Sequence, residues 1–197
     1  MATLRQLRDR VRSLKNTQQI TRAMKMVAGA RIRRAELAMR AARPYASAIG
    51  DMLGELSSAG GADHPLLQQR DVAASAILLM TADKGLCGAF NSNLVRAASS
   101  LARDMADPHF SIVGVKGHVQ LRNTPAKIDA TWPLQGKPFV ELAKEVAARL
   151  SGDFLNGTVG SVTLVSCGFV STIVHRPTPM QLVPIAPAAS RERSSQS

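Results

Sequence analysis

The chain has 197 residues, of which 45% are hydrophobic and only 4% aromatic. This length suits one ordinary domain with an appendage, and its core must be built from aliphatic side chains. No apolar run approaches the roughly 18 residues that a membrane-spanning helix needs, which excludes an integral membrane protein. The apolar content also excludes a chain that is disordered throughout.

The two cysteines, Cys87 and Cys167, exclude a disulfide-rich scaffold and a four-cysteine zinc site. The four histidines are scattered without ligand spacing, so we expect neither a metal nor a cofactor. The first residues are rich in arginine, as in organelle transit peptides, but they lack a secretory signal pattern and show a helical apolar period instead. We therefore expect both thiols to be reduced in a cytosolic setting.

The positive charge is concentrated at the start of the chain. The formal net charge is +11, and residues 1–43 hold 12 of the 25 Lys and Arg residues but only Asp9 and Glu36 among the acids. The rest of the chain is nearly neutral. A basic arm of this kind fits a nucleic acid, a membrane surface or an acidic protein partner.

Residues 2–57 are predicted to form one long helix, capped by Thr3 and kinked or restarted near Pro44. Good helix formers dominate it, and its first 43 residues would span roughly 65 Å, so it must project from a small domain. Apolar residues recur at alternating steps of three and four, which is a coiled-coil seam that needs a partner helix. We call these residues the seam: Leu4, Leu7, Val11, Leu14, Ile20 and Val27.

After a linker over residues 58–71, apolar runs alternate with helical patterns. Strands are expected at 75–81, 110–115, 127–132 and 161–170, with helices from Asn91 or Ser92 to about 106, at 117–123 and at 138–150. This alternation predicts a Rossmann-like α/β domain over 72–176 with a mostly parallel sheet. Residues 177–197 are expected to be an exit segment and a disordered tail.

The turn at 82–93 follows a strand and leads into a helix, which permits two interpretations. It contains Gly85 and Gly88, and a helix N-terminus there is able to cradle a phosphate. Its spacing matches neither the P-loop nor the dinucleotide fingerprint, so a structural turn that includes Cys87 and Asn91 is favoured. No base lies near Cys87 in the sequence to activate its thiol.

The basic arm lacks the features that a nucleic-acid or membrane helix needs. No helix-turn-helix or zipper accompanies its cations, although they would suit phosphate contacts. It also lacks the broad apolar face with Trp or Phe that is typical of membrane-surface helices. The residues alone favour a coiled-coil arm whose cations face solvent or an acidic protein.

Four ordered stretches resemble the gamma subunit of the F-type ATP synthase. They are SLKNTQQITRAMKMVAGARIRRAE (13–36), TADKGLCGAFNSNLVR (81–96), IVGVKGHVQLRN (112–123) and VSCGFVSTIVHRPTPMQLVPI (165–185). The resemblance implies a non-catalytic rotor shaft, in which the N-terminal helix pairs with a C-terminal helix inside a ring of alpha and beta subunits. It further implies contacts with the epsilon subunit and the c-ring, and coupling of proton-driven rotation to ATP synthesis.

The resemblance also assigns expected contacts on the arm. Met24 and Lys25 are expected to face acidic loops of the beta subunits, and Arg33 and Arg34 are expected to serve in coupling. Gln18 and Thr21 are expected to be coupling or partner-contact residues. These are coupling roles and not catalytic ones.

The resemblance stops before the second shaft helix of the family. After Pro187 the residues are AASRERSSQS, without the family's C-terminal motif. We therefore expect a truncated gamma subunit of bacterial type at the cytoplasmic face of the inner membrane. Two alternatives stay open: a nucleic-acid-binding adaptor that uses the basic arm, and a small nucleotide-binding enzyme that uses the turn at 82–93.

Overall fold

A computed structural model describes residues 3–58, 64–169 and 174–185 of the chain. They divide into two compact units, Met1–Met52 and Leu53–Ser197, and each is described by itself. The expected disordered tail lies outside the described residues, as does the middle of the expected linker.

Helix α1 spans Leu4–Ser58, close to the predicted 2–57. Thr3 caps it as expected: the Thr3 amide donates to Gln6 Oε1 over 2.9 Å, and the Gln6 amide donates to Thr3 Oγ1 over 3.4 Å. This reciprocal pair is a capping box, which satisfies two amides that the first turn leaves without helical partners.

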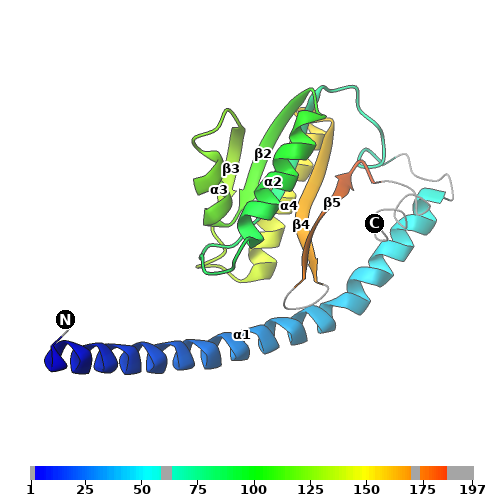
Figure 1. Cartoon of the computed structure of the whole chain (residues 1–197). Coiled ribbons are helices and arrows are strands. Elements are labelled where there is room, and N and C mark those ends of the chain that lie inside the picture. Colours follow the sequence, from blue (N-terminus) through cyan, green and yellow to red (C-terminus); the bar gives the residue numbers. More distant parts are fainter. Residues whose placement is uncertain (1–2, 59–63, 170–173, 186–197) are drawn as a thin grey trace. The chain divides into compact units, whose positions relative to one another are not determined.

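The expected restart at Pro44 is not found, because α1 is assigned as one unbroken helix with Pro44 inside it. Figure 1 shows α1 as one continuous ribbon. A proline removes one main-chain hydrogen bond and crowds the carbonyl four residues earlier. The helix formers on either side propagate the helix across this single defect.

The second unit contains a five-stranded sheet in the order β3-β2-β1-β4-β5 (Figure 1). Strands β1 to β4 are parallel to their neighbours, and β5 pairs antiparallel with β4. The strands are β1 Ala74–Met80, β2 Asp107–Val113, β3 Lys127–Trp132, β4 Ser161–Phe169 and β5 His175–Val183. The helices between them are α2 Phe90–Arg103, α3 Val115–Leu121 and α4 Phe139–Leu155. The predicted α/β class and mostly parallel sheet are confirmed.

The predicted end of the α/β domain at residue 176 is wrong. Residues that were expected to form an exit segment belong to β5, which includes Pro177 and Pro179. Prolines argue against a central strand because they cannot donate to a ladder, but β5 lies at an edge of the sheet and tolerates them. Beyond β5, the Ile185 amide donates to the Leu66 carbonyl over 2.9 Å.

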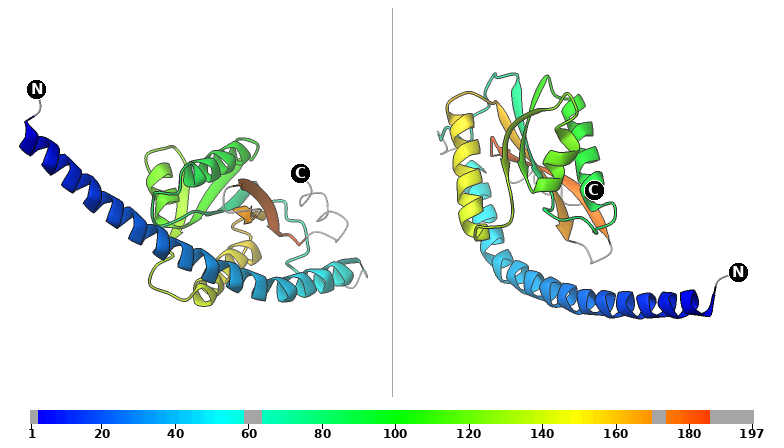
Figure 2. Two further views of the ribbon diagram at one scale, coloured as in Figure 1. Left: turned by 60° about the horizontal axis from the view of Figure 1, so that its bottom comes forward. Right: turned by 90° about the vertical axis from the view of Figure 1, so that its left-hand side faces the viewer.

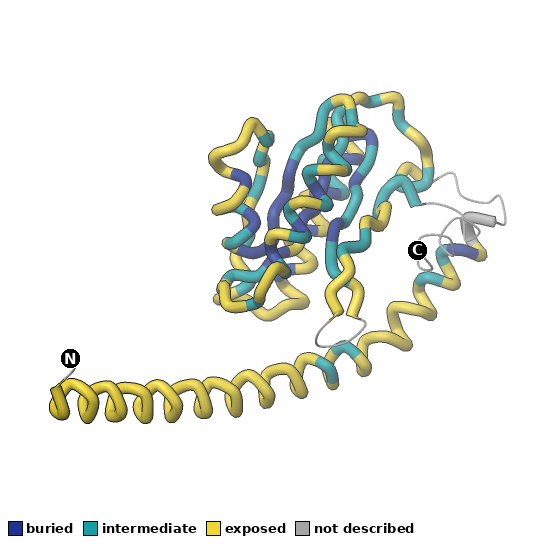
Figure 3. Tube along the Cα trace, in the orientation of Figure 1, coloured by how far each residue is buried: buried dark blue, intermediate teal, exposed yellow. Residues whose placement is uncertain are grey.

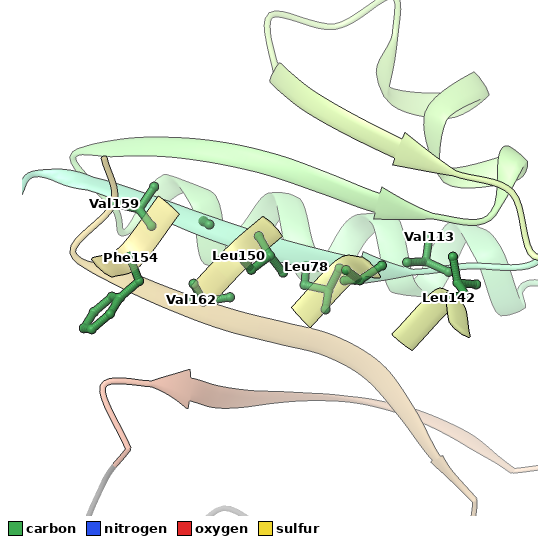
Figure 4. Packing of buried hydrophobic residues seen from close by; sticks show 9 residues of the cluster. Leu78, Val113, Leu142, Leu150, Phe154, Val159 and Val162 are labelled. Carbon is green, nitrogen blue, oxygen red and sulfur yellow. The ribbon is translucent and has the colours of Figure 1, made fainter. Parts of the chain in front are cut away.

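Two apolar layers cover the sheet. On one face α4 packs Leu142, Val146, Leu150 and the fully buried Phe154 against the strands (Figure 4). On the other face α2 and α3 enclose a second cluster, whose buried members include Leu94 and Ala98 of α2 and Leu121 of α3. The right-hand view of Figure 2 shows the sheet between these helices. Side chains at alternate positions of β1 therefore enter opposite layers, as a sheet covered on both faces requires.

Candidate functional site

Helix α1 presents its apolar seam to solvent. The seam residues are 49% to 69% exposed, from Leu7 at the lower limit to Leu14 at the upper (Figure 3). A row of large aliphatic side chains at coiled-coil spacing is the pattern of a helix that binds another helix. The structure thus places the predicted seam on an accessible surface, and its pairing remains a prediction.

The predicted coupling residues lie on the same exposed helix: Gln18, Thr21, Met24, Lys25, Arg33 and Arg34. Met24 is 52% exposed. The Thr21 hydroxyl donates to the carbonyl of Thr17 over 2.9 Å and to that of Gln18 over 3.0 Å, so the helix itself satisfies its donor. Thr21 therefore needs no polar partner outside the helix.

The turn after β1 brings together its four predicted residues. Leu86 and Gly88 adopt the left-handed region, with φ of 61° and 57°, and Leu86 is 96% exposed. Asn91 is buried; its Nδ2 donates to Cys87 Sγ over 3.1 Å, and its Oδ1 accepts from the Ala82 amide over 2.9 Å. Asn91 therefore ties the start of α2 to the end of β1.

The predicted cap of α2 by Asn91 or Ser92 is wrong. The N-cap residue is Ala89, which has no side-chain cap, and the Ser92 hydroxyl donates to the Ala89 carbonyl. The Asn91 side chain does not cap α2, because its Oδ1 accepts a hydrogen bond from the Ala82 amide at the end of β1.

Asp83 joins three loops at the carboxyl edge of the sheet. Its carboxylate accepts hydrogen bonds from the amides of Val115 (3.0 Å), Leu134 (3.1 Å) and Gln135 (2.8 Å). Partial burial alone would raise the pKa of Asp83, but these three amides and the charge of Lys84 outweigh it and lower the pKa below its ordinary value. The carboxylate is thus a fixed anion that holds the β2–α3 and β3–α4 connections to β1.

Beside Asp83, β1 and α3 approach each other closely. The Thr81 hydroxyl is buried, lies 3.1 Å from the Val113 and Gly114 carbonyls, and accepts from the Gly117 amide over 2.9 Å. A Cβ on Gly114 would lie 2.2 Å from the Thr81 carbonyl oxygen, and φ at Gly114 is 96°. Only glycine fits this position.

These contacts occupy the edge where doubly wound sheets commonly bind ligands. The turn also carries the exposed Lys84, but its fixed groups are the Asp83 anion, the buried Asn91 amide and a half-buried thiol that accepts a hydrogen bond, and a fixed anion disfavours a phosphate. Burial raises the pKa of the Cys167 thiol, and a hydrogen bond with the Arg176 backbone lowers it by less. Cys167 is therefore held as the neutral thiol, which is less reactive than the thiolate. The structure therefore favours the structural-turn interpretation.

Sequence reasoning missed the role of Asp83. The amides that it binds lie 32 to 52 residues further along the chain, and only the folded sheet brings them to it.

Within the described ranges, no three His, Cys, Asp or Glu side chains gather as a metal site requires. A search of the described helices finds none whose length and apolarity would allow it to cross a membrane.

The chain has a long exposed helix with an apolar seam and a small α/β domain. The edge of the sheet at which such domains commonly bind ligands is filled by the domain's own side chains. These features define a protein that works by binding other proteins. Comparison with known proteins gives the family. A family model described as ATP synthase matches residues 3–197, and the chain belongs to this family.

The relatives it resembles are ATP synthase gamma chains. The gamma chain of Desulforamulus reducens is 40% identical over 198 residues, covering all of this chain and 70% of the relative. That of Synechococcus sp. is 37% identical over 195 residues, covering 95% of this chain and 62% of the relative. The chain thus spans about two thirds of the length of these curated relatives.

Solved structures agree with the fold. The central stalk and c-ring structure of the Tetrahymena thermophila mitochondrial ATP synthase contains a chain that is 25% identical, with a TM-score of 0.67 over 84% of this chain and 72% of that one. A chain of the Euglena gracilis mitochondrial enzyme is 17% identical, with a TM-score of 0.52 over 89% of this chain and 55% of that one, and shows the shared fold alone. None of these relatives supports the nucleic-acid alternative.

Proposed function

We propose that this chain is a non-catalytic central-stalk subunit of an F-type ATP synthase, and that α1 forms half of its rotor shaft. The observation that carries the proposal is the exposed seam of α1 in a chain of this family. In the proposed assembly the seam pairs with a second helix as an antiparallel coiled coil. Rotation of the shaft couples proton flow to the catalytic sites of the beta subunits.

The proposed partners are the alpha and beta subunits around the shaft, and the epsilon subunit and c-ring at its foot. The Tetrahymena relative is part of a central stalk with its c-ring. The positive charge of residues 1–43 suits an acidic ring of partner loops, since opposite charges steer association and fix orientation. As a gamma-type subunit the chain belongs to a membrane-bound complex, and we place it at the cytoplasmic face of the bacterial plasma membrane.

Reconstitution tests this function. The chain is mixed with the alpha and beta subunits of the same organism, and the mixture is examined by size-exclusion chromatography and by an ATPase assay. We expect a stable complex with ATPase activity above that of the alpha and beta subunits without this chain. Elution of the chain apart from the other subunits, with no gain in activity, would refute the proposal.

A pair of variants tests whether the seam is the binding surface. Leu14→Asp places a charge in the seam, whereas Asn16→Asp places the same charge about 200° further around the helix. We expect the first variant to weaken complex formation at least tenfold and the second to change it less than twofold, because a buried unpaired charge is costly at a helix interface. Equal effects of the two variants would contradict a one-sided seam.

We further propose that Met24 and Lys25 contact acidic loops of the beta subunits, that Gln18 and Thr21 contact a partner subunit, and that Arg33 and Arg34 act in coupling. Lys25→Glu reverses one charge inside this proposed contact, and Lys15→Glu makes the same change outside it. We expect Lys25→Glu to lower the ATPase rate of the assembled complex while leaving its assembly intact, with little effect of Lys15→Glu. The rate is to be measured on complexes purified at equal composition.

A further inference from the structure

His109 lies between two carboxylates on the side of the sheet that α4 covers. Its Nδ1 is 3.0 Å from Asp129 Oδ2, and its Nε2 is 3.3 Å from Asp107 Oδ2. Lys127 Nζ contacts the other oxygen of Asp107 over 2.5 Å. Two acids and two bases from β2 and β3 thus form one cluster, in which the imidazole joins the two strands.

A β-bulge places Asp129 against the imidazole. Phe110 pairs with Ile128, but Ser111 pairs with Ala130, so Asp129 is an extra residue in β3. A bulge of this kind leaves one residue outside the ladder and redirects its side chain. Strand β3 is also an edge strand, paired with β2 alone, so contacts with β2 determine how firmly it is held.

The protonation state of the imidazole decides how many of these contacts hold. A protonated imidazole donates from both nitrogens, whereas a neutral imidazole has one donor and turns a lone pair towards the other carboxylate. We propose that His109 is a proton-operated clamp that fastens the edge strand β3 to β2. Protonation engages Asp107 and Asp129 together, and loss of the proton releases one of them.

The surrounding charges support this arrangement. With His109 protonated, the cluster has two positive and two negative groups, and with His109 neutral one negative charge is in excess. From α4, Arg149 interacts with Asp129 electrostatically but bonds Asp153 through its Nε over 2.8 Å. From β1, the residue opposite His109 is the buried and uncharged Ala76.

The direction of the pH effect follows from the same contacts. The hydrogen bond with Asp129 raises the pKa of His109 above its ordinary value of 6.5; partial burial opposes this rise and the bond with Asp107 adds to it. A group whose pKa is raised by folding stabilises the folded state fully below its unfolded pKa, and this stabilisation is lost as the pH rises through the folded pKa. The clamp is therefore closed in mild acid and open in mild alkali.

Hydrogen exchange on the full chain tests the clamp. Protection of the β3 amides is measured at about pH 5.5 and about pH 8.5, on either side of the histidine range, relative to β1 in the same sample and after correction for intrinsic rates. We expect the relative protection of β3 to fall about fivefold at the higher pH. This factor corresponds to the free energy that one partly exposed charged contact typically contributes. In His109→Gln the relative protection should be low and independent of pH.

A matched control lies on the opposite side of the same strand. His118 of α3 bonds Thr131 Oγ1 through its Nδ1 over 3.1 Å, with no carboxylate in the contact. His118→Gln should keep the pH dependence of the wild-type chain. The proposal is overturned if wild-type β3 shows no pH dependence relative to β1, or if His109→Gln retains it.

A direct titration covers the case in which His109→Gln does not fold. The C–H proton resonances of His109 in the wild-type chain should titrate with a midpoint above 6.5, and Asp129→Asn should lower that midpoint. A midpoint at or below 6.5, or one unmoved by Asp129→Asn, would equally overturn the clamp. Neither experiment involves the other subunits, so failure of the proposed rotor function would leave its result unchanged.

Discussion

Asp83→Ala is the substitution whose effect on stability follows most directly from the structure. The Asp83 carboxylate accepts three backbone amides, from Val115, Leu134 and Gln135, and its replacement leaves all three without a protein partner. Each hydrogen bond contributes about 1 kcal/mol net to the free energy of unfolding, and somewhat less here because the site is only half-buried. Asp83→Ala should therefore lower the free energy of unfolding by about 2–3 kcal/mol at neutral pH. Asp83→Asn keeps one acceptor oxygen and should cost about half as much.

Urea unfolding followed by the fluorescence of Trp132, the single tryptophan, measures this loss. Because folding lowers the pKa of Asp83, its contribution is fully present above the ordinary value of 3.8 and is lost as the pH falls through the folded pKa. The difference between wild type and Asp83→Ala should therefore shrink in strong acid. The exposed Asp71→Ala is the matched control. A loss below about 0.5 kcal/mol, the range of ordinary surface substitutions, would refute the role given to the three hydrogen bonds.

Three further substitutions and one condition have defined outcomes. Gly114→Ala forces a Cβ to within 2.2 Å of the Thr81 carbonyl oxygen and should prevent stable folding. Gly136 also has a positive φ, of 102°, but nothing lies within 4 Å of the Cβ that Gly136→Ala would add. That substitution should lower the free energy of unfolding, measured in urea, by only about 1–2 kcal/mol. Phe154→Ala removes a fully buried ring that also lies 4.8 Å from the Arg70 guanidinium, and should cost about 4 kcal/mol in the same assay. The isolated chain should fray along residues 2–43 or self-associate; a fully helical and monomeric arm, by circular dichroism and sedimentation, would contradict this.

The elements with strong local patterns could be predicted from the sequence. The strand expected at 127–132 is β3, Lys127–Trp132, and the apolar run expected at 75–81 is β1, displaced by one residue. Continuous apolar runs bounded by turn residues suffice for such strands. The capping box at Thr3 is equally local, since its partner is three residues away.

The features that the sequence did not reveal depend on distant neighbours. Strand β5 contains two prolines, and only its place at the edge of the sheet makes them acceptable. Asn91 suggested a helix cap by its residue type, but the path of β1 brings the Ala82 amide to its side chain. The bulge at Asp129 has no local signal, because it exists only in the register with β2.

The hydrogen bond between the Ile185 amide and the Leu66 carbonyl has an architectural consequence. It joins the segment that enters the sheet to the segment that leaves it, so the α/β domain begins and ends at one point. A module with adjacent ends is in effect an insertion in the chain, and such modules tolerate replacement by others of different size. The domain between Leu66 and Ile185 can therefore change in length or surface while its two ends stay joined by this hydrogen bond.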